Sequence, residues 1–120
     1  MKRNMDLIRL VLLKIEAKET SAALYASDLQ IESYTKEEIA YSCKLLYEAG
    51  YVSDYKPFYA DNTLCDFGVG SMTWEGQDYL ESVRDNTRWG KIKKIAKEKG
   101  IPLMFNTVID ISKKLIIAAL

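Results

Sequence analysis

The fold is decided by residues 35–50, TKEEIAYSCKLLYEAG, which run directly into residues 51–56, YVSDYK. Thr35, followed three residues later by Glu38, forms the capping-box pattern that begins a helix. Gly50 predicts the end of that helix, because glycine adopts the left-handed backbone of a helix C-terminus without steric cost. Aromatic and β-branched side chains in residues 51–56 are typical of a strand. The stretch therefore predicts a helix that leads at once into a strand.

This strand is expected to be the first half of a β-hairpin. Residues 57–62 have turn chemistry, which predicts a loop of about 6–8 residues, and residues 64–72 supply the return strand. Gly68 and Gly70 predict a bulge or bend in the return strand. On the preceding helix, the stripe expected to be buried consists of Ile39, Cys43, Leu46 and Tyr47. The opposite stripe, expected to be exposed, consists of Glu37, Tyr41, Lys44 and Glu48.

Further helices are predicted on both sides of this centre from the spacing of apolar residues and from capping residues. They cover Met5 to Lys18 with Asn4 as N-cap, Thr73 to about Asn86, Arg88 to Lys99, and a last helix capped by Asn106 or Thr107, with Val108, Ile109, Leu115 and Ile116 on its inner side. Gly76 lies on the inner face of its helix, which predicts a close approach of another backbone. Residues 19–34 are expected to form an irregular link, with a short strand near 29–32.

The expected order of helix, link, helix, hairpin and three further helices is typical of a winged-helix-like domain. We therefore predict an α+β, mostly helical chain, with a winged-helix-like domain over residues 1–87 and a C-terminal helical extension over residues 88–120 packed on the same domain. The helix at 35–50 would be the recognition helix and the hairpin the wing. Whether the middle helix of a helix-turn-helix forms within residues 19–34 is left open.

Several stretches resemble an uncharacterised, winged-helix-like family of small bacterial proteins that are often encoded in phages and prophages. The resemblance covers about residues 1–97 and is carried by Met1 to Arg9, Glu37 to Leu46, Glu48 to Gly50, Thr73-Trp-Glu-Gly76, Tyr79-Leu80, Arg84-Asp85 and Trp89. Members of that family often carry histidine where this chain has Cys43 and Gln77. Because this chain departs from the family at both positions, we expect neither residue to have a catalytic or metal-binding role.

Composition excludes several classes of function. The chain has 120 residues, 48% of them hydrophobic, with 17 basic and 17 acidic residues, no histidine and 2 cysteines. Without imidazole, and with two thiols that lack partners for a tetrahedral site, we expect no enzyme activity, no cofactor and no bound metal. No apolar run approaches the ~20 residues of a membrane span, so we expect a cytoplasmic protein with reduced thiols that does not enter the membrane.

The charged residues are distributed unevenly. Residues 61–83 carry 5 acidic and no basic residues, whereas residues 84–120 carry 9 basic and 3 acidic residues. A continuous helix would place Arg84, Arg88 and Lys91 on one face, where they could contact phosphates without reading sequence. The same pattern is also that of an ordinary solvated helix.

The primary hypothesis is a winged-helix DNA-binding protein, a phage or prophage regulator with weak sequence specificity. Its candidate nucleic-acid-binding residues are Lys44, Lys56, Arg84, Arg88 and Lys91. The alternative is a protein–protein interaction module on the same scaffold without DNA binding, for which the candidate partner-binding residues are Tyr41, Tyr55 and Tyr59.

A homodimer is also expected, formed through the first and last helices. Leu10, Leu13, Ile117 and Leu120 extend the apolar surface of those helices beyond one face. The alternative is that the two helices cover each other within one chain.

Overall fold

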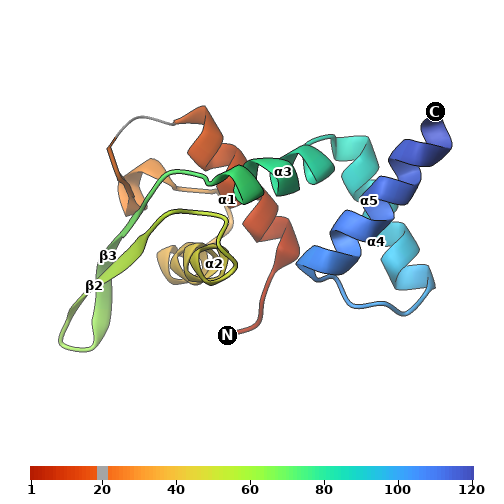
Figure 1. Ribbon diagram of the computed structural model, residues 1–120. Coiled ribbons are helices and arrows are strands. Elements are labelled where there is room, and N and C mark those ends of the chain that lie inside the picture. The colour runs from red at the N-terminus through yellow and green to blue at the C-terminus, as the bar shows by residue number, and fades with distance from the viewer. Residues whose placement is uncertain (19–21) are drawn as a thin grey trace. The chain divides into compact units, whose positions relative to one another are not determined.

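The computed structural model describes residues 1–18 and 22–120, and these residues form five α-helices and one three-stranded antiparallel sheet (Figure 1). In chain order the elements are α1 (Met5–Ala17), β1 (Leu24–Tyr25), the 3₁₀ helix η1 (Ala26–Asp28), α2 (Lys36–Glu48), β2 (Tyr55–Ala60), β3 (Thr63–Val69), α3 (Trp74–Val83), α4 (Asn86–Glu98) and α5 (Phe105–Ala119). The α+β, mostly helical class is confirmed. Among the described residues, no helix has the length and apolar character needed to cross a membrane.

The chain comprises two compact units, which divide within α3. Unit 1 is Met1–Gln77 and unit 2 is Asp78–Leu120. Unit 1 contains the sheet with α1, η1 and α2, and unit 2 contains most of α3 with α4 and α5. The domain division expected from the sequence, 1–87 and 88–120, stays a prediction.

The ends of the first two long helices form as their capping residues predict. The Asn4 side chain accepts a hydrogen bond from the Leu7 N–H at 3.1 Å. Thr35 Oγ1 accepts the Glu38 N–H at 3.1 Å, while Glu38 Oε1 accepts the Thr35 N–H at 3.0 Å, which completes the capping box. Gly50 has φ +78° and closes α2.

The buried face of α2 is shorter than the sequence predicts. Ile39, Cys43 and Leu46 are buried, as expected. Tyr47 is 47% exposed, so its assignment to the core is wrong. Tyr47 follows the buried Leu46 and lies about 100° further around α2, on a side that is exposed.

The hairpin turn is tighter than predicted. β2 continues through Pro57 to Ala60, and the turn consists of Asp61 and Asn62, with φ values of 52° and 62°. These two residue types tolerate the left-handed backbone that a two-residue hairpin turn requires. Pro57 can lie within a strand because the strand order is β1-β3-β2, which makes β2 an edge strand. The predicted loop over residues 57–62 is therefore wrong.

Two further expectations about the sheet are corrected. The register shifts between Phe58 and Tyr59, which leaves Cys65 as the extra residue on β3, so the bulge does not lie at the glycines. The strand ends at Val69, directly before Gly70, and not at residue 72. Gly68 instead lies beside the Tyr25 ring. The short strand expected near residues 29–32 occurs earlier, at β1, where Leu24 and Tyr25 pair with Val69 and Gly68, and η1 follows it.

The start of α3 is joined to the end of α2 by Thr73 and Gly76. Thr73 Oγ1 donates to the Gly50 carbonyl at 2.6 Å and accepts the Gly76 N–H at 3.1 Å. A Cβ atom at Gly76 would overlap the Tyr51 carbonyl oxygen and the Met72 side chain. The predicted close backbone approach is confirmed.

Unit 2 has a small core between its helices. The rings of Tyr79 and Phe105 meet edge to face at 4.8 Å between centroids. Ser112 Oγ donates to the Ser82 carbonyl at 2.9 Å. The inner face predicted for the last helix is partly wrong. Only Val108 of its four predicted residues is buried, and the other buried side chains of α5 are Ile111 and Ser112 in the next turn.

Helix boundaries in unit 2 also differ from the prediction. α3 ends at Val83, and Asp85 caps α4 by accepting the Arg88 N–H at 2.7 Å, so one helix does not continue to Asn86. α5 begins after Met104, whose N–H donates to Thr107 Oγ1 at 3.0 Å. Thr107 therefore caps the helix from within its first turn, and Asn106 is not the N-cap.

Candidate functional site

Four of the residues singled out from the sequence line one hollow of about 310 Å³ between α2 and the hairpin. We call it the α2–hairpin groove, and its lining residues are Met1, Glu37, Ala40, Tyr41, Lys44, Tyr55, Tyr59, Asn62 and Leu64. The structure thus brings all three candidate partner-binding tyrosines together with one candidate phosphate-binding lysine.

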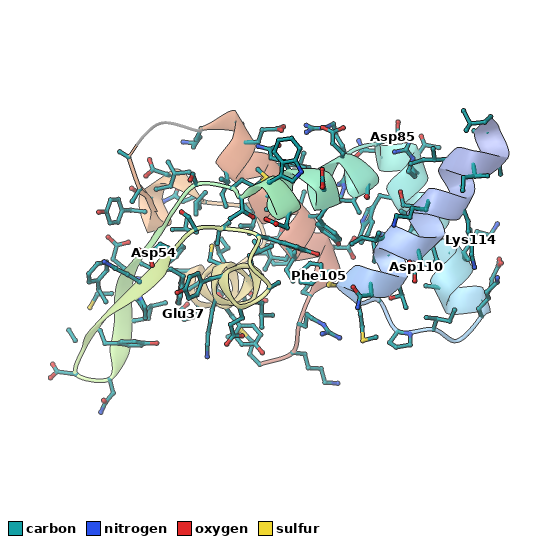
Figure 2. All side chains as sticks on the ribbon, viewed as in Figure 1. Glu37, Asp54, Asp85, Phe105, Asp110 and Lys114 are labelled. Atoms are coloured by element: carbon teal, nitrogen blue, oxygen red, sulfur yellow. The ribbon has the colours of Figure 1, made fainter. Side chains whose placement is uncertain are left out.

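Helix and strand periodicity explain this convergence. Glu37, Tyr41 and Lys44 are spaced at i, i+4 and i+7, which places them on one side of α2. Figure 2 shows Glu37 on the side of α2 next to the hairpin. Alternation along β2 places Tyr55 and Tyr59 on the same face of the hairpin.

Lys56 lies outside the groove, because it alternates with Tyr55 and points to the opposite face of β2. Its Nζ lies 3.8 Å from the Asp54 carboxylate, and both side chains are largely exposed. Lys44 and Lys56 therefore do not form one phosphate-binding surface.

Burial changes the ionisation of two groups in this part of the molecule. Desolvation, with a smaller contribution from the charge of nearby Tyr59, raises the pKa of Tyr55 to about 12. A tyrosine hydroxyl is protonated at neutral pH even at its ordinary pKa, and the raised pKa of Tyr55 extends the pH range over which it can donate a hydrogen bond. On the buried side of α2, burial raises the pKa of the Cys43 thiol to about 12, in keeping with the prediction of a small buried apolar residue.

In unit 2, Arg84 and Arg88 do not share a continuous helix. Arg84 lies between α3 and α4, and its guanidinium binds the Glu81 carboxylate at 2.8 Å. Arg88 Nη1 donates to the Glu81 carbonyl at 3.5 Å. The single basic face expected from Arg84 through Lys91 is therefore interrupted where Asp85 begins the new helix (Figure 2).

A row of lysines follows along α4 and just past its end. This α4 lysine row consists of Lys91, Lys94, Lys97 and Lys99, and all four are exposed. None of them forms an ion pair with any residue in the described ranges 1–18 and 22–120. Lys93 differs, because its ammonium group lies 5.7 Å from the centre of the Trp89 ring.

Sequence reasoning did not find two other hollows, since their residues come from separate elements and share no motif. One, in unit 1, has a volume of about 800 Å³ and lies between the loop before α2 and β3. Two of its charged side chains have hydrogen-bond partners: Lys36 Nζ donates to the Cys65 carbonyl at 3.0 Å, and Asp66 Oδ1 accepts the N–H groups of Ala26 and Phe67. The other lies in unit 2, between α4 and α5.

Within the part of the chain that the structure describes, no group of three or more His, Cys, Asp or Glu side chains is arranged to hold a metal ion. The α2–hairpin groove presents tyrosine hydroxyls and rings, one lysine and one carboxylate, and the α4 lysine row presents ammonium groups.

Comparison with known proteins finds a bacterial relative of this chain. A protein of Haemophilus influenzae, described as uncharacterized, is 29% identical over 118 residues, which are 97% of this chain and 96% of the relative. No solved structure matches the chain. Residues 2–102 match the family described as Hypothetical protein (DUF2513). Since this match spans far more than half of the 120 residues, the chain belongs to the DUF2513 family.

Proposed function

We propose that the chain is a duplex-DNA-binding protein of weak sequence specificity, with a winged-helix-like unit 1 and a phosphate-binding unit 2. The succession α1, β1, η1, α2, β2, β3 and the strand order β1-β3-β2 support the winged-helix-like arrangement, with η1 in place of the middle helix. A phage or prophage regulator, as the sequence resemblance implies, is the biological setting of this proposal. It is a binding function and not an enzymatic one.

The α4 lysine row is the observation that carries the proposal. Unit 1 has 8 basic and 12 acidic residues, whereas unit 2 has 9 basic and 5 acidic residues. Exposed lysines without ion pairs can neutralise phosphates and release counterions, which supplies sequence-independent affinity. The exposed side of α2 carries Glu37 and Glu48, whose charges phosphates repel, so little base reading is expected from it.

The test is the salt dependence of binding to a labelled 20-base-pair duplex of random sequence. With four lysines in contact, the plot of log K against log salt concentration should have a slope of about −3 to −4. The double variant Lys94→Glu/Lys97→Glu should bind at least ~10-fold more weakly at 50 mM salt, with a slope shallower by about 2.

The matched control is Lys113→Glu/Lys114→Glu, which changes the net charge equally on α5. Its affinity should fall clearly less than that of the α4 variant. Equal losses in the two variants would mean that overall charge, and not the α4 lysine row, governs binding. Absence of duplex binding by the unaltered chain at 50 mM salt would contradict the proposal itself.

A second candidate function, protein binding in unit 1, is favoured by the α2–hairpin groove. Tyrosines are enriched in protein interfaces, and here three of them line one hollow with Leu64. In affinity capture from a bacterial extract, a specific partner should be held by the unaltered chain and by Phe58→Ala, but lost with Tyr59→Ala. Phe58 is the control because it lies on the other face of β2 and is also exposed. A partner lost from both variants, or from neither, would contradict this second function.

A further inference from the structure

Unit 2 contains a hollow of about 360 Å³ with two chemically different walls. Its residues come from the start of α4 and the end of α5, and we call it the α4–α5 groove. The α4 wall consists of Asp85, Thr87, Arg88 and Lys91, and the α5 wall consists of Leu115, Ile116, Ala119 and Leu120. One wall is therefore polar with two cations, while the other is entirely apolar.

The apolar wall is left open to solvent in the described chain. Ile116 is 41% exposed and Leu120 is fully exposed, whereas the preceding turns of α5 bury Val108 and Ile111. Contiguous exposed apolar side chains on a folded surface mark a contact site more often than isolated ones do. The end of α5 thus has a different surface from its beginning.

We propose that the α4–α5 groove binds an acidic amphipathic helix of a partner protein. The apolar face of such a helix would cover Ile116 and Leu120, and its carboxylates would lie against Arg88 and Lys91. Helices that place an apolar face in a groove and fix their orientation by charge are a common recognition mode. Asp85 in the same wall leaves it with one net positive charge, and the Asp85 carboxylate is held at the start of α4, where it accepts the Arg88 N–H.

The two walls also favour an acidic helix over two other occupants of the groove, a second copy of the chain and duplex DNA. Two-fold pairing of the same groove in two copies would enclose two cations from each copy, and Asp85 is the one acidic side chain that each groove supplies to oppose them. Duplex DNA would use the two cations but would leave Ile116 and Leu120 in water. An acidic helix with an apolar face satisfies both walls.

The test uses the full chain and a labelled synthetic 16-residue helix with leucines along one face and glutamates on the other. Binding should be lost with a scrambled peptide of the same composition and with a peptide that has lysine in place of glutamate. Ile116→Asp should weaken binding at least ~10-fold, because it places a like charge in the apolar wall. Ile117→Asp is the matched control, since Ile117 is the adjacent residue, is 68% exposed and does not line the groove.

The cationic wall gives an independent pair of variants. Lys91→Glu should weaken peptide binding, while Lys94→Glu, three residues along α4 and outside the groove, should leave it unchanged. If Ile116→Asp still binds duplex DNA, the apolar wall of this groove is not needed for the proposed DNA binding. The proposal is overturned if the unaltered chain fails to bind the peptide, or if both isoleucine variants weaken binding equally. It is also overturned if sedimentation shows a dimer that Ile116→Asp dissociates, because a second copy would then cover the groove.

Discussion

Replacement of Gly76 by alanine is expected to lower the free energy of unfolding by about 3 kcal/mol. The added Cβ would occupy the space of the Tyr51 carbonyl oxygen and the Met72 side chain, and a backbone oxygen cannot move aside as the end of a flexible side chain can. The Thr73 hydroxyl, which binds both Gly50 and Gly76, holds the same two segments together. Urea denaturation followed by circular dichroism measures the change.

Gly90→Ala is the control for this substitution. Gly90 lies inside α4, and no atom lies within 4 Å of a Cβ built there. Alanine has the higher helix propensity, so this variant should be more stable by about 0.5–1 kcal/mol. A Gly76→Ala variant as stable as the unaltered chain would show that α3 does not approach Tyr51 this closely.

Leu46→Ala is expected to destabilise the chain by about 3 kcal/mol, because Leu46 is completely buried and its removal leaves a cavity in the core of unit 1. Tyr47→Ala, at the next residue of the same helix, should cost less than about 1 kcal/mol because Tyr47 is 47% exposed. Thermal unfolding of both variants at the same pH gives the comparison. A larger loss of stability in Tyr47→Ala than in Leu46→Ala would show that Tyr47 is a core residue, as its helical spacing predicts.

The parts of the fold that short-range chemistry determines could be predicted from the sequence. The capping box at Thr35 and Glu38 and the glycine end at Gly50 involve residues at most five apart, so they locate α2 closely. The hairpin was predicted but its turn was misplaced, because Pro57 is a strong turn signal unless the strand is at an edge. Strand order is a tertiary property, and the sequence does not display it.

The candidate site likewise has a part that the sequence predicts and a part that depends on the tertiary structure. Helical spacing alone places Tyr41 and Lys44 on one side of α2, so both could be chosen from the sequence. That Tyr55 and Tyr59 meet them, while Lys56 points away, depends on where β2 begins and on the hairpin register. The interruption after Val83 depends on Asp85 as the N-cap of α4, and no capping residue was predicted for that helix.

Pro57 also has a consequence for contacts between molecules. An edge strand of six residues could add strands from other chains, and repeated addition is the route to fibrils. Pro57 has no N–H to donate to an incoming strand, and the charged Lys56 beside it would be brought against its own copy in a parallel in-register stack. The chain can therefore present its aromatic hairpin to solvent while the same two residues oppose intermolecular sheet growth along β2.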